Sequence, residues 1–121
     1  WDDMEVTTPR IICIDDVYFM IYAGLNQNDS KDIPKAFGLA RSNDLVNWEK
    51  YPWNPVFRIA NEGSWDDGAL WFGTLFNLDG FIYMTYEGGR MKNILGKTPA
   101  LTQVGLAKVS LNTFKSHVLN W

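Results

Sequence analysis

The sequence contains one pattern twice, with the second copy 64 residues after the first. Residues 17–24 (VYFMIYAG) return as residues 81–88 (FIYMTYEG), and the tripeptide Trp-Asp-Asp at residues 1–3 returns at residues 65–67. Self-similarity at a fixed period of this length indicates one supersecondary unit built twice. We therefore expect two copies of the same small unit, and a fold for this chain must accommodate both.

The central segment of each unit is predicted to be a buried β-strand. In residues 17–24, seven apolar residues run together before the glycine, without the polar alternation of a strand that has one face in water. Both faces should therefore be covered, and we expect residues 17–23 and 81–86 to be the most buried strands. The full set of expected strands is 10–14, 17–23, 36–41 and 48–57 in the first unit and 69–78, 81–88 and 103–109 in the second.

One window also has the spacing of an amphipathic helix. Five apolar residues recur there at intervals of three or four: Leu101, Val104, Ala107, Leu111 and Phe114. However, Gly-Leu-Ala at residues 105–107 repeats Gly-Leu-Ala at residues 38–40, which favours a strand. The sequence thus predicts an all-β protein.

Four strands per unit, short connections and buried inner strands are typical of the blades of a β-propeller. Blades pack face to face, which explains why the central strand of each unit has no polar face. We expect two four-stranded antiparallel blades, residues 1–62 and residues 63–121, within one structural domain.

Composition excludes several classes of function. The net charge is −3 and no basic run occurs, so no nucleic-acid partner is expected. No apolar run is long enough to span a membrane, so no membrane partner is expected. One cysteine and one histidine cannot supply an internal disulfide or a Cys/His zinc site. We expect no cofactor and no metal site, and the sequence indicates no particular compartment.

Residues 42–49 (SNDLVNWE) resemble the S-x-D-L-x-x-W-E segment of the five-bladed β-propeller glycosidases, and residues 51–56 (YPWNPV) are similar to a Y-P-x-N-P-V stretch in some of them. That superfamily includes arabinanases and β-xylosidases, invertases and levanases, and mannoside phosphorylases. The resemblance covers nearly the whole chain, as two blades of five. It implies a glycoside hydrolase-like protein that acts on or binds oligosaccharide or polysaccharide glycosides. The alternative is a non-catalytic sugar-binding or assembly module on the same scaffold.

The resemblance also implies carboxylates near the central axis, at the start of each inner strand. Cleavage of a glycosidic bond needs an acid together with a base or nucleophile. Relatives often carry an Asp directly before a strand-opening proline, but here Thr8 precedes Pro9, and Phe72 precedes the equivalent Gly73. The candidates for catalysis are therefore the remaining acids near these strands, namely Glu5, Glu87, Asp3 and Asp67.

The repeat distinguishes acids that occur in both copies from acids that occur in only one. Because Trp-Asp-Asp occurs in both copies, it favours a structural turn in which Asp2 and Asp66 make equivalent backbone hydrogen bonds. Glu5 and Glu87 each have an alanine as counterpart, so they differ between the copies as functional residues should. We expect these two glutamates to be freer and nearer a pocket; the alternative is a solvated strand end.

Three further residues are candidates for binding a substrate. Arg10 follows the strand-opening proline, and its planar guanidinium could hold a sugar hydroxyl or a phosphate. Trp71 and Trp53 could stack on a pyranose ring. The alternatives are a structural ion pair for Arg10 and packing within or between blades for the tryptophans.

Two blades are not expected to stand alone. Five units of 64 residues make about 320 residues (5 × 64), whereas this chain has 121, which is about 1.9 units. Each unit would leave one apolar face bare, and such a patch marks an interface. We expect the chain to form a homo-oligomer, a dimer or trimer, or to be a fragment of a longer chain, with carbohydrate as its other partner.

Overall fold

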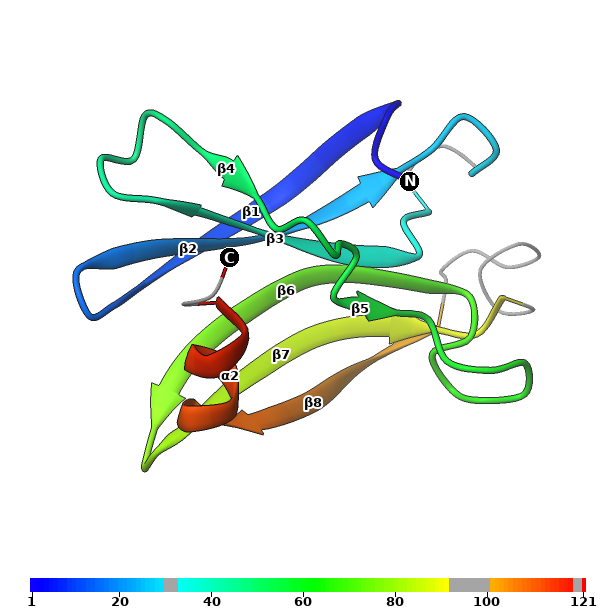
Figure 1. Cartoon of the computed structure of the whole chain (residues 1–121). Coiled ribbons are helices and arrows are strands. Elements are labelled where there is room, and N and C mark those ends of the chain that lie inside the picture. Colours follow the sequence, from blue (N-terminus) through cyan, green and yellow to red (C-terminus); the bar gives the residue numbers. More distant parts are fainter. Residues whose placement is uncertain (30–32, 92–100, 119–120) are drawn as a thin grey trace.

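The computed structural model describes residues 1–29, 33–91, 101–118 and 121. In these ranges the chain forms two antiparallel sheets and one short helix, so the predicted all-β class is confirmed (Figure 1). The first sheet contains β1 (Glu5–Ile14), β2 (Val17–Leu25), β3 (Ala36–Ser42), β4 (Glu49–Lys50) and β5 (Phe57–Arg58). The second contains β6 (Ala69–Leu78), β7 (Phe81–Gly89) and β8 (Thr102–Ser110), and α2 (Leu111–Val118) follows it. None of the helical residues described here belongs to a segment with the length and hydropathy that crossing a membrane requires.

The two sheets repeat the same strand register. Ile11 lies opposite Met20 in the β1–β2 hairpin, and Leu75 lies opposite Met84 in the β6–β7 hairpin, 64 residues later. Every other paired residue of the first hairpin likewise has its counterpart 64 positions on. Met20 and Met84 therefore occupy equivalent sites in two copies of one unit, as the sequence repeat predicts.

The outer edge of the first sheet is covered in two pieces. β3 pairs with β4 and also with β5, so the strand predicted at residues 48–57 is interrupted. Pro52 and Pro55 lie between the two pieces, and a proline cannot donate to a strand ladder. The side chain of Asn54 fills the gap, because it accepts from the Leu39 amide at 2.8 Å and donates to the Leu39 carbonyl at 2.9 Å.

The second sheet has three strands in the order β6-β7-β8, and along the chain α2 follows β8 as β4 follows β3 in the first unit. The helical spacing noted in the sequence therefore applies to its second half, where Leu111 and Phe114 lie on α2, while residues 102–110 form the predicted strand. Ser110 ends the strand and caps the helix, since its hydroxyl accepts from the Thr113 amide at 3.0 Å. Val118, at the end of α2, is buried between the sheets.

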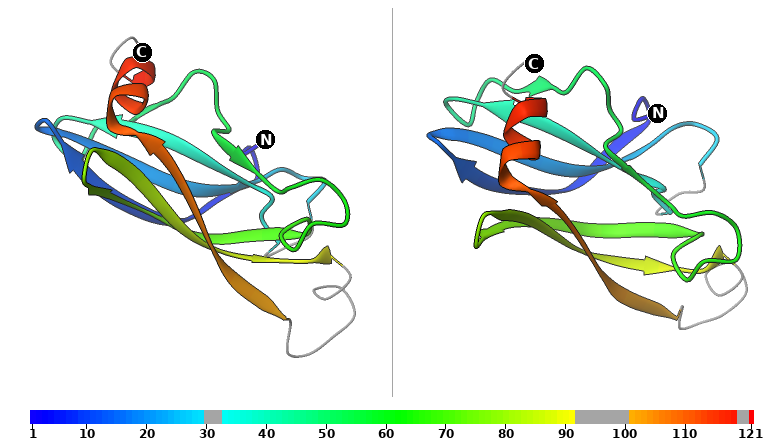
Figure 2. Two further views of the ribbon diagram at one scale, coloured as in Figure 1. Left: turned by 90° about the horizontal axis from the view of Figure 1, so that it is seen from below. Right: turned by 60° about the horizontal axis from the view of Figure 1, so that its bottom comes forward.

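The sheets stack as two layers, and each layer has two distinct faces (Figure 2). We call the face that carries Ile21, or its counterpart Thr85, the front, and the face that carries Met20 or Met84 the back. The front of the first sheet packs on the back of the second, with Ile21 and Met84 in one apolar cluster. A second cluster lies nearer α2 and contains Phe19, Leu39, Ile14, Ile82 and Val118.

Burial follows this arrangement and differs from the prediction in one respect. β3 is the most buried strand, with six of seven residues buried, while β2 has six of nine. β7 alternates between buried and half-buried positions over most of its length, so it is not covered on both faces. The reason is that only the back of β7 faces the first sheet. In contrast, the front of β3 packs on the second sheet, Trp1 and Tyr22 lie against Gly38 on its back, and β4 and β5 pair with its outer edge.

The repeated Trp-Asp pairs hold the start of each unit. Trp1 stacks on Tyr22 and Trp65 on Tyr86, with ring centroids 5.7 Å apart in both cases. The tyrosine hydroxyls donate to Asp2 at 3.0 Å and Asp66 at 2.9 Å. The two aspartates therefore have equivalent bonds, as expected, but the shared donor is a tyrosine hydroxyl rather than a backbone amide, and Asp2 also accepts from the Lys50 ammonium at 2.6 Å.

Candidate functional site

The inner strands β1 and β6 lie against each other and share one irregularity. Each has a β-bulge at the same point of the repeat, and there a residue other than glycine takes a positive φ, 51° at Thr8 and 55° at Phe72. Bulges re-aim side chains, and backbone strain of this kind concentrates at binding sites. The Thr8 hydroxyl is also buried without a hydrogen-bond partner among the described residues. The inner edge of each sheet therefore carries the same irregularity at the same position of the repeat.

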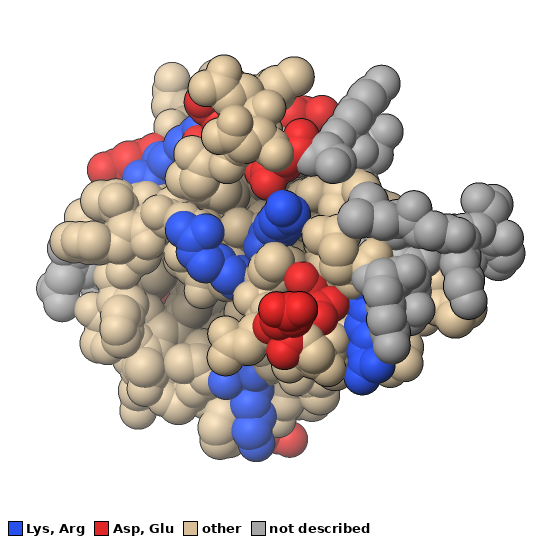
Figure 3. Space-filling view, turned by 90° about the vertical axis from the view of Figure 1, so that its right-hand side faces the viewer, with Lys and Arg blue, Asp and Glu red and all other residues tan. Residues whose placement is uncertain are grey.

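Charged side chains of both signs lie at the end of the molecule where β1 and β6 begin (Figure 3). Two predicted candidates, Asp3 and Glu5, lie at the start of the first sheet, and both are exposed. Neither carboxylate makes a hydrogen bond or ion pair with the described part of the chain. They are thus available to a ligand, but nothing in their surroundings orients them.

Asp67 is held by the backbone. One carboxylate oxygen accepts from the Met91 amide at 3.0 Å, and the other accepts from the Gly63 amide at 2.7 Å. These two hydrogen bonds, of which the one from the Met91 amide has the larger effect, hold the pKa of Asp67 below its usual range. Asp67 therefore remains ionised and cannot serve as a proton donor near neutral pH, although it ties the loop before β6 to the end of β7.

Glu87 and Trp71 lie opposite each other on β7 and β6. Glu87 is half-buried, and the Thr102 hydroxyl donates to its Oε1 at 2.6 Å, which fixes the orientation of the carboxylate. Glu87 is thus less free than the sequence suggested. Both residues lie on the front of the second sheet, because their neighbours Leu70 and Tyr86 pack on the back toward the first sheet. In the first unit Ala23 takes the place of Glu87 and is fully buried.

The remaining two binding candidates lie elsewhere. Arg10 is exposed on β1, and its Nη1 donates to the neighbouring Pro9 carbonyl at 3.0 Å. Trp53 is two-thirds exposed and lies in the turn between β4 and β5, edge-on to Tyr51 at 5.3 Å. The structure therefore brings Trp71 and Glu87 together and leaves Trp53 on the other side of the second sheet.

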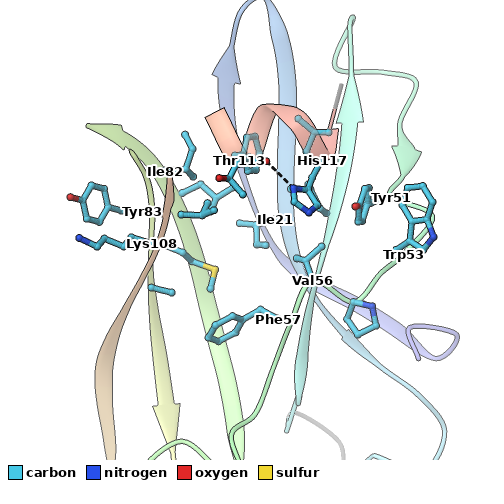
Figure 4. Close-up of a pocket in the computed structure, with 18 residues that line it drawn as sticks. Ile21, Tyr51, Trp53, Val56, Phe57, Ile82, Tyr83, Lys108, Thr113 and His117 are labelled. Atoms are coloured by element: carbon cyan, nitrogen blue, oxygen red, sulfur yellow. Dashed lines mark hydrogen bonds between the residues drawn. The ribbon is translucent and has the colours of Figure 1, made fainter. Parts of the chain in front are cut away.

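Trp53 borders a groove of about 580 Å³ between the outer parts of the two sheets (Figure 4). Its walls are mostly apolar, and α2 closes one end, where His117 Nδ1 donates to the Thr113 carbonyl at 2.8 Å. The groove exists because twisted sheets diverge away from their line of contact. No sequence signal marked it, since its lining comes from segments far apart in the chain.

Sequence reasoning also missed Thr102. This residue follows the loop in which the second unit is longer than the first, and its counterpart at the offset of this strand is Lys35, a residue of another type, so the repeat did not point to it. Within the described ranges, no three His, Cys, Asp or Glu side chains gather in an arrangement suited to a metal ion.

Two stacked antiparallel sheets with adjacent inner strands are neighbouring blades of a β-propeller. No known family model and no curated protein sequence matches the chain. Solved structures do match it. An N-acetylgalactosamine deacetylase from F. plautii, in complex with blood group B trisaccharide, has a TM-score of 0.69 and 16% identity, over 95% of this chain and 36% of that one.

Two glycosidase-type structures match in the same way. A GH43_1 enzyme from Xanthomonas citri complexed with xylose has a TM-score of 0.66 at 12% identity, over 89% of this chain and 30% of that one. RS223-β-xylosidase has a TM-score of 0.65 at 14% identity, over 86% of this chain and 32% of that one. The chain thus spans about a third of each of these proteins. Its fold is that of a portion of the β-propeller seen in these structures, which confirms the predicted resemblance at the level of fold.

Proposed function

We propose that the chain is a portion of a carbohydrate-active β-propeller protein, with residues 1–62 and 63–121 as its two blades, and that Glu87 and Trp71 form part of an oligosaccharide-binding site. The observation that carries this proposal is the Glu87–Trp71 pair itself. A carboxylate on β7, fixed by Thr102, lies opposite a tryptophan on the inner strand β6, and the first unit has a buried alanine in place of the glutamate.

The chemistry of this pair suits a sugar. A pyranose ring presents an apolar face to an aromatic ring and hydroxyl groups at its edge, which a carboxylate accepts. Thr102 engages only Oε1 of Glu87, so Oε2 is left to accept from a ligand rather than from a described residue. Arg10, Asp3 and Glu5, at the inner edge and the start of β1, are proposed as further contacts.

In a glycoside hydrolase, Glu87 would serve as one of the two required carboxylates. The second would be Glu5 or Asp3 rather than Asp67, because Asp67 is committed to two backbone amides and its pKa is lowered. Hydrolysis as the activity of the whole protein is supported by the glycosidase-type fold and by the resemblance of residues 42–49.

One observation favours a non-catalytic sugar-binding module as the alternative. The two bulge positions, where relatives of this kind often carry an acid, hold Thr8 and Phe72. A propeller without acids at these points would keep the scaffold and the binding surface but would lack a carboxylate pair across the scissile bond.

Calorimetric titration tests the binding site with xylotriose and blood group B trisaccharide as probes. We expect Trp71→Ala and Glu87→Gln each to weaken binding about tenfold or more, which corresponds to about 1.4 kcal/mol. Trp53→Ala is the matched control, because it removes an exposed tryptophan outside the proposed site. If Trp53→Ala abolishes binding while Trp71→Ala has no effect, the site lies in the groove and the assignment is wrong.

Turnover of aryl glycosides separates the two functions. A hydrolase would release the aryl alcohol, and Glu87→Gln would lower that rate by at least a hundredfold. A chain that binds the oligosaccharide probes without any turnover would support the binding module instead.

A further inference from the structure

A second pocket, smaller than the groove, lies at the end of the first sheet where β2 begins and β3 ends. Its volume is about 310 Å³, and its lining is polar or charged apart from one valine: Val17, Arg41, Ser42, Asn43, Asn47 and Glu49. Pockets that bind small molecules have volumes of about 300–1,000 Å³, so this pocket suits one ring-sized ligand. The groove does not share this chemistry, because its walls are mostly apolar.

The pocket is on the front of the first sheet, at the seam with the second. Arg41 lies opposite Phe19 in the register, and Phe19 packs with Ile82 of the second sheet. Nη2 of Arg41 donates to the Trp121 carbonyl at 2.8 Å, and its guanidinium lies 4.6 Å from the centroid of the Trp121 ring. A further blade could pack only on the back of the first sheet or the front of the second, so it would leave this pocket open.

The turn between β3 and β4 forms one wall of the pocket and is held by its own side chains. The Asp44 carboxylate accepts from the Asn47 amide at 2.7 Å and from the Val46 amide at 2.9 Å. It also accepts from Nδ2 of Asn47 at 2.7 Å, which fixes the plane of that side chain. Oδ1 of Asn47 and the side chain of Asn43 have no hydrogen-bond partner among the described residues. The turn therefore presents free polar atoms on an ordered frame.

Arg41 and Glu49 form the other wall as an ion pair, with 2.8 Å between Nη2 and Oε2. Nε of Arg41 donates to the same Oε2 at 2.9 Å, so Oε1 of Glu49 is left without a partner in the described part of the chain. Nη1 of Arg41 donates to the Val118 carbonyl at 3.4 Å, and this nitrogen carries a second N–H. The pocket thus offers free donors and acceptors while its two charges cancel.

We propose that this pocket binds one neutral sugar unit through adjacent hydroxyl groups. A hydroxyl both donates and accepts, so neighbouring hydroxyls can satisfy the free oxygen of Glu49 and the free N–H of Arg41 together. An anionic ligand would be repelled by the Glu49 carboxylate, and a cationic ligand would be repelled by the Arg41 guanidinium. Val17 supplies an apolar surface for the C–H groups of the ring.

This pocket is separate from the site proposed at Glu87 and Trp71. The counterpart of Glu87 in the first unit is Ala23, which lies six residues along β2 from Val17. At about 3.3 Å per residue, these two positions of the repeat are about 20 Å apart along the strand. The two sites therefore lie toward opposite ends of the strands, and sugar binding in the pocket does not depend on Glu87.

Amide chemical shifts of the isotope-labelled chain test the proposal during titration with D-galactose and D-xylose. Either neutral sugar should produce saturable changes at Asn43 and Asn47 at millimolar concentration, and D-galacturonate should bind at least fivefold more weakly. Asn43→Ala should weaken binding at least fivefold, because it removes an amide that has no structural hydrogen bond. Asn112→Ala is the control, because Asn112 is exposed on α2 and does not line the pocket.

Glu49→Gln separates recognition from a structural effect. It leaves Arg41 as the one charge of the pocket, so galacturonate should then bind more tightly than the neutral sugars. Circular dichroism should show that the variants fold as the wild type does; if Asn43→Ala does not, Asn43→Ser replaces it. The proposal is overturned if neither neutral sugar changes the shifts of Asn43 and Asn47, if Asn43→Ala binds as the wild type does, or if galacturonate already binds the wild type equally well. Shifts of Trp71 and Glu87 report the other site, so the two proposals fail independently.

Discussion

Leu39 and Leu106 offer a matched test of how the two sheets pack. Both are the leucine of a Gly-Leu-Ala tripeptide at the same position of the repeat, yet Leu39 is 4% exposed and Leu106 is 62% exposed. Complete burial of a leucine side chain contributes about 1.5–3 kcal/mol by transfer alone. The difference in exposure is about three-fifths of the side chain, so transfer accounts for about 1–2 kcal/mol of difference between the two sites.

Leu39→Ala should cost more than transfer alone, because it leaves a cavity. Leu39 packs with Ile14, Phe19 and Ile82, which come from both sheets and cannot all move into the space. Truncation of a buried leucine costs about 2–5 kcal/mol. Leu106→Ala should cost about 0.5 kcal/mol or less, as at other exposed positions.

Urea denaturation measures both changes, with the free energy of unfolding taken from the midpoint at an unchanged m value. Each variant is compared with the wild-type chain at the same protein concentration. Equal costs for the two leucines would refute front-on-back packing, because both positions would then have the same surroundings.

Three other perturbations test the structure of the unit. Burial and the hydrogen bond to Asp66 raise the pKa of Tyr86 from 10.0 to about 12. Because the native state holds this proton more tightly than the unfolded chain, the free energy of unfolding should be constant below pH 10 and fall toward pH 12. Tyr86→Phe should reduce that fall, as measured by urea titrations at several pH values. Gly88→Ala should destabilise the chain by about 1–3 kcal/mol, because its new methyl would lie 2.9 Å from Cβ of Asp66, and thermal unfolding measures this loss. Ser110→Ala removes the cap on Thr113 and should cost about 0.5–2 kcal/mol, with reduced helical signal in circular dichroism.

The sequence predicted the features that repeat. The 64-residue period located both inner hairpins and their register, because the side chains that cover a buried strand must be apolar in both copies. It also marked the Trp-Asp pairs as structural. The donor to each aspartate was not predictable, because Tyr22 and Tyr86 read equally well as core residues of their strands.

The features that differ between the units were harder to predict. The helix α2 follows a strand within one window of helical spacing, and the boundary is set by the Ser110 cap and by packing of Phe114 and Val118 between the sheets. Glu87 was marked as a candidate because its counterpart is an alanine, but its bond to Thr102 depends on the path of a loop. The position of Trp53 could not be predicted from the sequence, because it depends on the path of the turn between β4 and β5.

Amide chemical shifts of the isotope-labelled chain, recorded during titration with xylotriose, test the proposed site most directly. The account predicts that the largest changes occur at Trp71, Glu87 and Thr102 and at the bulge residues Thr8 and Phe72, and that they disappear in the Trp71→Ala variant. Changes confined to Tyr51, Trp53 and His117 would place the ligand in the groove between the sheets and would contradict it.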